Sequence, residues 1–163
     1  LKVFLDLANW KRIDIESQTP RKVGLVAQDN MQKELVNWVV FNEDLLSACE
    51  LHASRPLARA IEDESGLQVF GLADGPDGRQ QIGVLIAQGS IDLLVFFWNP
   101  LHADDSDVHT LQRLAALWNI PSAYNKATAD FLISSPLIDG SYRRAVPDLG
   151  HLLRGGPASV ENH

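Results

Sequence analysis

Two places in the sequence could hold an anion. Ser54 and Arg55 stand directly before Pro56, a residue suited to the first turn of a helix. Their hydroxyl and guanidinium groups could bind a negative charge at the helix N-terminus, although we favour a serine that only caps the helix beside a solvated arginine. Arg143 and Arg144 could likewise reach an anion on a neighbouring subunit, but we expect them to be solvated surface arginines.

A cluster of oxygen and nitrogen ligands lies between residues 102 and 109. It consists of His102, Asp104, Asp105, Asp107 and His109. No second histidine follows His102 at the spacing of four residues that brings two imidazoles to one helix face, and an acidic loop normally stays solvated. We therefore expect no metal site here. The glycine patterns of nucleotide-binding loops and the glycine-flanked serine of many hydrolases are also missing from the sequence.

The elements that must position these residues alternate between strands and helices. Short apolar runs predict strands at 23–27, 45–49, 67–72, 91–98 and 120–124. Helical spacing of the apolar residues between them predicts a three-layer, doubly wound α/β fold with a mainly parallel, five-stranded sheet. Ligands bind beyond the carboxyl ends of the strands in such a sheet. The segments expected to form the site are 28–33, 50–56, 74–81 and 99–107.

Composition narrows the class of protein. The 163 residues carry 14 basic and 21 acidic side chains, and the formal charge of -7 disfavours nucleic acid and anionic membranes as partners. The single cysteine, Cys49, excludes an internal disulfide, and no apolar run is long enough to span a bilayer. We expect a cytoplasmic protein with an N-terminal extension over 1–20, one domain over 21–153 and a flexible tail over 154–163.

Four stretches of the sequence follow a known pattern in the same order and at nearly the same spacing. They are residues 25–29, which read Leu-Val-Ala-Gln-Asp, and residues 75–83, 91–101 and 117–121 with 125–131. In these stretches, from about Arg21 to Pro136, the chain resembles the methylglyoxal synthase family. The resemblance implies elimination of phosphate from dihydroxyacetone phosphate to give methylglyoxal, without a metal or organic cofactor. It also implies a homo-oligomer, often a hexamer, whose contacts could use Trp10, Trp38 or the first segment.

The position of the catalytic base differs from that family. Where the family has Gly-Pro-x-Gly-Gly-Asp-Gln-Gln, residues 75–81 read Gly-Pro-Asp-Gly-Arg-Gln-Gln, one residue shorter. Arg79 stands where the family places its proton-abstracting aspartate, and a guanidinium cannot accept a proton near neutral pH. Asp77 lies two residues earlier, where a displaced base loses most of its effect.

The phosphate-binding positions differ as well. The family's Thr-Gly-Thr-Thr-Gly is replaced in the region of residues 49–56, which contains neither threonine nor glycine. Glu50 would repel a phosphate dianion at close range. The remaining donors are Ser54 and Arg55.

Three further positions of the family pattern can be compared. Asp29 matches the family, but a histidine before it and a lysine after it are both replaced by glutamine. Asn99 replaces an aspartate, and the following loop lacks the family's Pro-His, which leaves His102 as a displaced candidate electrophile. Asp107 corresponds to the last aspartate of the pattern and could simply cap the following helix.

The positions that differ from the family pattern are those that bind substrate or catalyse the reaction in the family. The positions that match the pattern are those that stabilise the fold. The kept residues are Gly75, Pro76, Gln80, Gln81, Pro100, Asn125, Thr128 and Asp130. We therefore interpret the chain as a methylglyoxal-synthase-like protein that has lost catalysis and acts as a metabolite-binding, anion-binding or assembly module. A small phosphorylated metabolite is its expected partner. The residues expected to contact this ligand are Ser54, Arg55, Gly75, Arg79, Asn99 and His102.

Two alternatives remain open. The first is an active methylglyoxal synthase with a rearranged site, in which Asp29, Asp77 or Asp107 is the base and Ser54 with Arg55 binds phosphate. The second is a structural subunit whose apolar N-terminal segment pairs with other chains.

Overall fold

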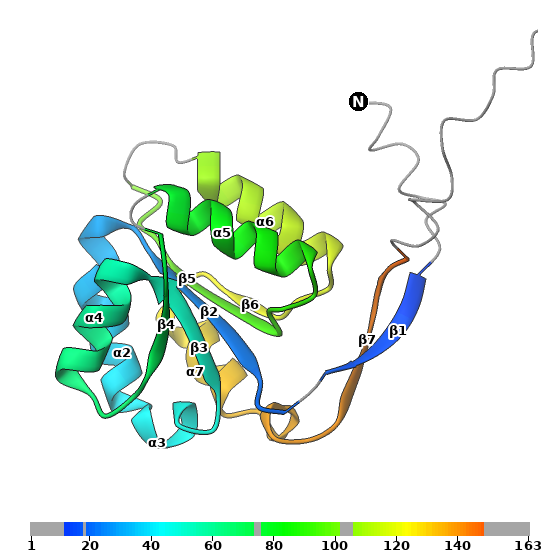
Figure 1. Cartoon of the computed structure of the whole chain (residues 1–163), viewed down its shortest axis with the longest axis horizontal. Coiled ribbons are helices and arrows are strands. Elements are labelled where there is room, and N and C mark those ends of the chain that lie inside the picture. Colours follow the sequence, from blue (N-terminus) through cyan, green and yellow to red (C-terminus); the bar gives the residue numbers. More distant parts are fainter. Residues whose placement is uncertain (1–11, 18, 74–75, 102–105, 149–163) are drawn as a thin grey trace, which may run out of the picture.

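A five-stranded parallel sheet forms the centre of the protein (Figure 1). The computed structural model describes residues 12–17, 19–73, 76–101 and 106–148. The strands follow the spatial order β4-β3-β2-β5-β6. Their bounds are β2 Lys22–Ala27, β3 Glu50–Ser54, β4 Val69–Leu72, β5 Leu93–Phe97 and β6 Ser122–Ala123. The parallel pairing of all neighbouring strands confirms the predicted doubly wound α/β fold.

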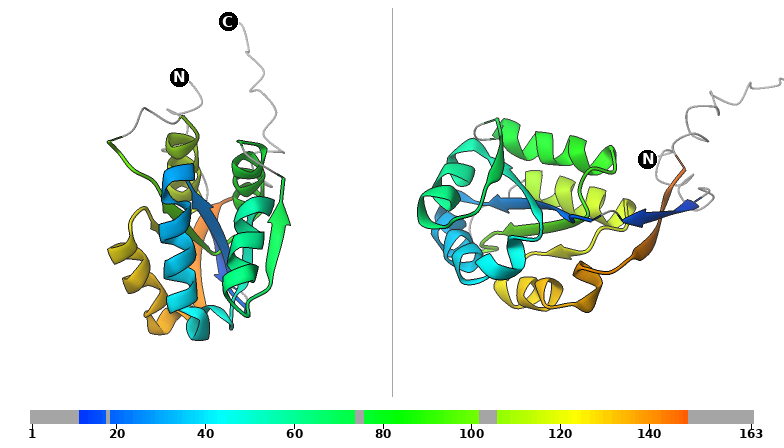
Figure 2. Two further views of the ribbon diagram at one scale, coloured as in Figure 1. Left: turned by 90° about the vertical axis from the view of Figure 1, so that its left-hand side faces the viewer. Right: turned by 60° about the horizontal axis from the view of Figure 1, so that its bottom comes forward.

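Helices cover both faces of this sheet and make the other two layers (Figure 2). On one face lie α2 (Gln32–Phe41), α4 (Arg55–Glu64) and α7 (Lys126–Ile133). On the other lie α5 (Pro76–Ala87) and α6 (Ser106–Leu117). The shorter helices are η2 (Asp29–Met31), α3 (Glu43–Leu46) and η3 (Pro136–Ile138). No helix in the described part of the chain is long and apolar enough to cross a membrane.

The central strand β5 explains why the fold could be recognised from sequence. All five of its residues are buried. Leu93, Val95 and Phe97 join the core beneath α2, α4 and α7, whereas Leu94 and Phe96 join the core beneath α5 and α6. A strand that is buried on both faces must read as a continuous apolar run.

The strand predicted at 45–49 is wrong. Residues 43–46 form the short helix α3, whose Leu46 is fully buried, and the second strand of the sheet is β3, which begins at Glu50. This strand alternates, with Leu51 and Ala53 buried between half-buried polar neighbours. A search for continuous apolar runs does not find β3, because one face of this strand is only partly buried and carries polar side chains.

A second, two-stranded antiparallel sheet was not predicted as a unit. It joins β1 (Arg12–Ser17) to β7 (Tyr142–Pro147), and this ribbon extends away from the central sheet (Figure 1). The interpretation of Arg144 as a solvated surface residue is wrong. Its side chain is buried, and its guanidinium donates hydrogen bonds to the carbonyl oxygens of Trp118 at 2.9 Å and Ile91 at 3.3 Å.

The expectation that Trp38 contributes to contacts between subunits is wrong, because Trp38 does not lie on the surface. Its ring is buried in the core against Phe97, with the ring centroids 6.0 Å apart. Its indole Nε1 donates a hydrogen bond to Asp130 Oδ1 at 2.9 Å. Trp38 therefore joins α2 to α7 within one subunit. The other tryptophan proposed for such contacts, Trp10, and the tail over 154–163 lie outside the described residues.

Candidate functional site

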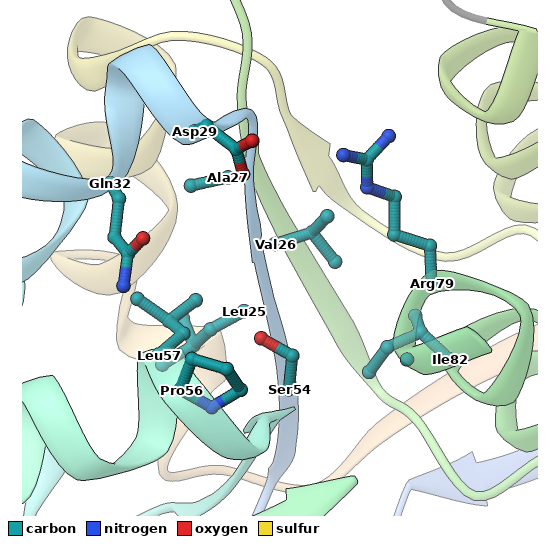
Figure 3. A pocket seen from close by; sticks show the side chains of 11 residues that line it. Leu25, Val26, Ala27, Asp29, Gln32, Ser54, Pro56, Leu57, Arg79 and Ile82 are labelled. Carbon is teal, nitrogen blue, oxygen red and sulfur yellow. The ribbon is translucent and has the colours of Figure 1, made fainter. Parts of the chain in front are cut away.

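A pocket of about 180 Å³ lies at the carboxyl ends of β2 and β3, beside the first turn of α5 (Figure 3). It unites three of the four segments that the sequence predicted. Its lining residues are Leu25, Val26, Ala27, Asp29, Gln32, Ser54, Pro56, Leu57, Gly78, Arg79 and Ile82. The position agrees with the general rule that ligands bind beyond the carboxyl ends of parallel strands.

Ser54 supplies a hydroxyl at the lower edge of the pocket in Figure 3. It occupies the N-cap position of α4, as predicted, but its side chain accepts no hydrogen bond from the first turn of that helix. The next turn begins with Arg55 and Pro56, and proline has no backbone N–H. The start of α4 therefore offers a phosphate one donor fewer than an ordinary helix N-terminus does.

Arg79 forms the opposite wall. It belongs to the first turn of α5, and in Figure 3 its side chain stands across the pocket from Asp29 and Gln32. Its Nη1 lies 3.6 Å from Oδ2 of Asp107 at the start of α6, and the two side chains are 20% and 31% exposed. A guanidinium only donates hydrogen bonds, so this wall of the pocket can attract an anion but cannot remove a proton.

Asp29 is the one carboxylate among the lining residues of this pocket. It lies in η2, directly after β2, and its side chain is exposed. Gln32 follows three residues later, and its amide points toward Leu57 (Figure 3). Any proton transfer that uses a lining side chain as the base therefore has to use Asp29.

Asn99 and Gln28 hold the end of the sheet together and do not line the pocket. The Gln28 backbone N–H donates to the Phe97 carbonyl at 3.1 Å, and Gln28 Oε1 accepts from the Asn99 backbone N–H at 2.9 Å. The Asn99 side chain accepts a hydrogen bond from the Leu101 backbone N–H at 3.0 Å. These amides connect the ends of β2 and β5, a role that the sequence did not reveal.

The structure brings some of the predicted site residues together and separates others. Asp29, Ser54 and Arg79 line one pocket, and Asp107 pairs with Arg79 behind its wall. Arg55 is exposed and is not part of the lining. The predicted residues Gly75 and His102, together with the Asp77 side chain, lie outside the described part of the structure.

The sequence analysis did not name eight of the lining residues as site residues, although Gln32, Pro56 and Gly78 fall within the segments that it predicted. They are Leu25, Val26, Ala27, Gln32, Pro56, Leu57, Gly78 and Ile82. Gln32 could have been found, because it follows Asp29 by three residues and so shares its helical face. Pro56 and Leu57 carried no chemical signal, and they reach the pocket because α4 begins directly after the carboxyl end of β3. Within the described ranges, no group of three metal-ligating side chains is present.

Comparisons with known proteins agree with one another. Residues 34–124 match the family model of the MGS-like domain. The chain is 43% identical over 137 residues to methylglyoxal synthase of Yersinia enterocolitica, which spans 82% of this chain and 90% of that protein. It is 47% identical over 131 residues to methylglyoxal synthase of Vibrio campbellii, which spans 78% of this chain and 87% of that protein.

A solved structure has the same fold. The crystal structure of methylglyoxal synthase from Elizabethkingia anophelis NUHP1 superposes with a TM-score of 0.78 at 37% sequence identity. The match covers 91% of this chain and 99% of the other.

Proposed function

The chain belongs to the MGS-like domain family of methylglyoxal synthases, and we propose from this that its pocket binds a small phosphorylated metabolite without eliminating the phosphate. The observation that supports the proposal is Arg79, a permanent cation on the pocket wall that is held by Asp107 at 3.6 Å. In the family resemblance, this position corresponds to the carboxylate that abstracts a proton.

Exchanging a carboxylate for a guanidinium affects binding and catalysis in opposite directions. A guanidinium strengthens the attraction for phosphate, because charge-assisted hydrogen bonds are about twice as strong as neutral ones. It also removes the proton acceptor on which the elimination depends. Pro56 further weakens the phosphate cradle at α4, and loss of one transition-state donor typically lowers kcat by about 10²–10³-fold.

The size of the pocket favours a small ligand. Its volume of about 180 Å³ is below the range of about 300–1,000 Å³ that is typical of pockets for drug-sized molecules. Leu57, Pro56 and Ile82 make an apolar floor, while Ser54 and Arg79 offer donors from two sides (Figure 3). A three-carbon phosphate fits this arrangement better than a nucleotide does.

The test combines a turnover assay with a binding assay on the same preparation. Dihydroxyacetone phosphate is incubated with the chain, methylglyoxal is measured by trapping it with an aromatic diamine, and binding is measured by calorimetry. We expect saturable binding and no methylglyoxal above the rate of the uncatalysed reaction. Turnover that disappears in Asp29→Asn would refute the loss of catalysis.

An active synthase with Asp29 as its base is the second candidate. It is favoured by one observation, the Asp29 carboxylate that opens onto the same pocket as Ser54 and Arg79. Asp107 is less suited to this task because it already pairs with Arg79. The relatives at 43% and 47% identity are methylglyoxal synthases.

We further propose a cytoplasmic homo-oligomer, with a hexamer as the state that the family resemblance implies. Phe41 on α2 is 86% exposed and Phe131 on α7 is 82% exposed. Burying these large apolar side chains in a contact between subunits would favour association. Light scattering coupled to size exclusion measures the mass directly, and a monomeric mass would refute the proposal.

A further inference from the structure

An open groove of about 310 Å³ runs between α5 and α6. Apart from Arg79, it shares no lining residue with the pocket at the carboxyl ends of the strands. Most of its surface is apolar, so it is better suited to apolar side chains than to an anion or a metal ion. Its apolar wall consists of Gly83, Val84 and Ala87 of α5 and Leu111 and Leu114 of α6.

Gly83 brings the two helices close together at the bottom of the groove. A Cβ atom at this position would lie 3.2 Å from Cδ1 of Leu114 and 3.7 Å from Cδ2 of Leu111, so the leucines of α6 pack against the bare backbone of α5. Beside Gly83, the Val84 side chain is 54% exposed, and Ala87 and Leu114 are half-buried. Covering these apolar side chains would remove them from water, which is favourable.

The first eleven residues of the chain have a composition that suits such a groove. Seven of the eleven are apolar. Val3, Leu7 and Trp10 follow one another at spacings of four and three residues, which is the spacing of one face of a helix. At 1.5 Å per residue, a helix of eleven residues is about 16 Å long and the twelve residues of α5 extend about 18 Å. The segment therefore matches the groove in apolar character and in length.

The place where the described chain begins puts this segment within reach of the groove. β1 begins at Arg12, and Ile15 packs against the same core cluster as Ala87 and Leu114. The carboxyl ends of α5 and α6 point toward the side of the molecule from which the β1–β7 ribbon extends (Figure 1, Figure 2). Eleven residues span up to about 36–40 Å when they are extended, roughly twice the length of α5. The segment can therefore reach the groove of its own chain.

A covalent connection favours this occupant over a separate protein. A segment that is joined to its binding site by a short link has an effective concentration in the millimolar range, so a contact of modest affinity is largely formed. We propose that residues 1–11 dock into the groove between α5 and α6 of their own chain, with their apolar side chains against Gly83, Val84 and Leu114. The proposal does not depend on the proposed function, because it requires neither a phosphorylated ligand nor any step of catalysis.

The first test joins the segment to the groove with an engineered disulfide in the full chain. Cys49→Ser removes the native thiol. Val84→Cys is then combined in turn with Val3→Cys, Leu7→Cys and Trp10→Cys, and each variant is oxidised under dilute conditions. We expect at least one pair to form a disulfide within a single chain. It is detected as a monomer of altered mobility on a non-reducing denaturing gel and is identified by peptide mass spectrometry.

The control replaces Val84→Cys with Phe131→Cys in each pair. Phe131 is 82% exposed on α7, which covers the opposite face of the sheet. We expect the groove pair to form its disulfide at least about tenfold faster than the control pair. Disulfides that join two chains would overturn the proposal in favour of a second copy as the occupant. Failure of all three groove pairs to form a disulfide, or formation at the rate of the control, overturns it as well.

The second test detaches the segment from the groove. Val84→Asp places a carboxylate where the segment would bury it, and burying an unpaired charge is costly. Trypsin cleaves after Lys11, so the rate at which residues 1–11 are released, followed by mass spectrometry, reports how often the segment is undocked. We expect Val84→Asp to speed this release by about tenfold or more and Phe131→Asp to leave it unchanged. Equal release from both variants, with native circular dichroism, contradicts the assignment.

Discussion

Replacing Asp107 with asparagine is expected to tighten binding of a phosphorylated ligand. In the free protein, Asp107 Oδ2 lies 3.6 Å from Nη1 of Arg79, and Arg79 lines the pocket. A bound phosphate and Asp107 therefore compete for the same guanidinium. The asparagine side chain keeps the shape but carries no charge, so it competes less strongly with the ligand for Arg79.

The geometry limits the size of this effect. The distance of 3.6 Å is longer than the approximately 2.7–2.9 Å of a charge-assisted hydrogen bond, and both side chains are partly exposed. Measured pairs of this kind contribute about 0.2–1 kcal/mol. Releasing Arg79 should then lower the Kd by up to about fivefold. In contrast, Arg79→Gln removes a charge-assisted hydrogen bond of about 1.5–3 kcal/mol and should raise the Kd by about 10- to 140-fold.

Isothermal titration calorimetry with dihydroxyacetone phosphate at fixed ionic strength measures both changes. Asp63→Asn is the matched control, because it removes the same charge from the far end of α4 and reports any effect of net charge alone. The reasoning is refuted if Asp107→Asn binds more weakly than the unmodified chain, or if Asp63→Asn produces the same gain. Methylglyoxal formation that is lost in Asp107→Asn would instead identify this carboxylate as a base.

Three further predictions concern the scaffold around the site. Leu94→Ala empties a fully buried position on β5 and should lower the free energy of unfolding by about 2–5 kcal/mol in urea titrations. Gly78→Ala should abolish ligand binding by calorimetry, because a Cβ there would lie 2.3 Å from a backbone carbonyl oxygen and displace the first turn of α5. Hydrogen bonds from Lys126 and Trp38 lower the pKa of Asp130 below its usual 3.8. Stability from this carboxylate is thus present above pH 4 and lost as the pH falls through the lower folded pKa, and Asp130→Asn should flatten that loss in acid-unfolding curves.

Each of these predictions has an outcome that contradicts it. Leu101→Ala, at an exposed position, should change the unfolding free energy by less than about 0.5 kcal/mol, and a change as large as that of Leu94→Ala would show a general effect. Gly140→Ala should bind normally, since its nearest contact would be an ordinary 3.5 Å. An acid-unfolding curve that is the same for Asp130→Asn and the unmodified chain would refute the pH argument.

The sequence predicted the fold where burial alone determines the pattern. β5 is apolar along its whole length because helices cover both of its faces, and any scan for apolar runs finds it. β3 was misplaced because only one of its faces is fully buried, so Glu50 and His52 interrupt the run. The sequence did not predict that β1 and β7 pair. A mainly polar strand looks like a surface loop in the sequence until the strand that it pairs with is known.

The sequence predicted correctly which segments of the chain form the candidate site, but it was less accurate about which individual residues line it. The predicted topology was enough to place Asp29, Ser54 and Arg79 at the carboxyl ends of the parallel strands. It could not assign Gln28 to the hydrogen bond with the Asn99 backbone, because that contact joins residues 71 positions apart. Nor could it show that Arg144 is buried, since the carbonyl groups that make burial possible come from distant parts of the chain.

Several of the residues that the chain keeps from the family pattern make hydrogen bonds that hold the scaffold together. Asn125 caps α7 by accepting a hydrogen bond from the Thr128 backbone N–H at 2.9 Å. Asp130 accepts from Trp38 at 2.9 Å, and Gln81 accepts from a backbone N–H just before α5 at 2.9 Å. None of these contacts depends on the side chain at position 79. In the proposed function, an arginine at this position removes the proton acceptor without disturbing these contacts, which is why binding and turnover must be measured separately.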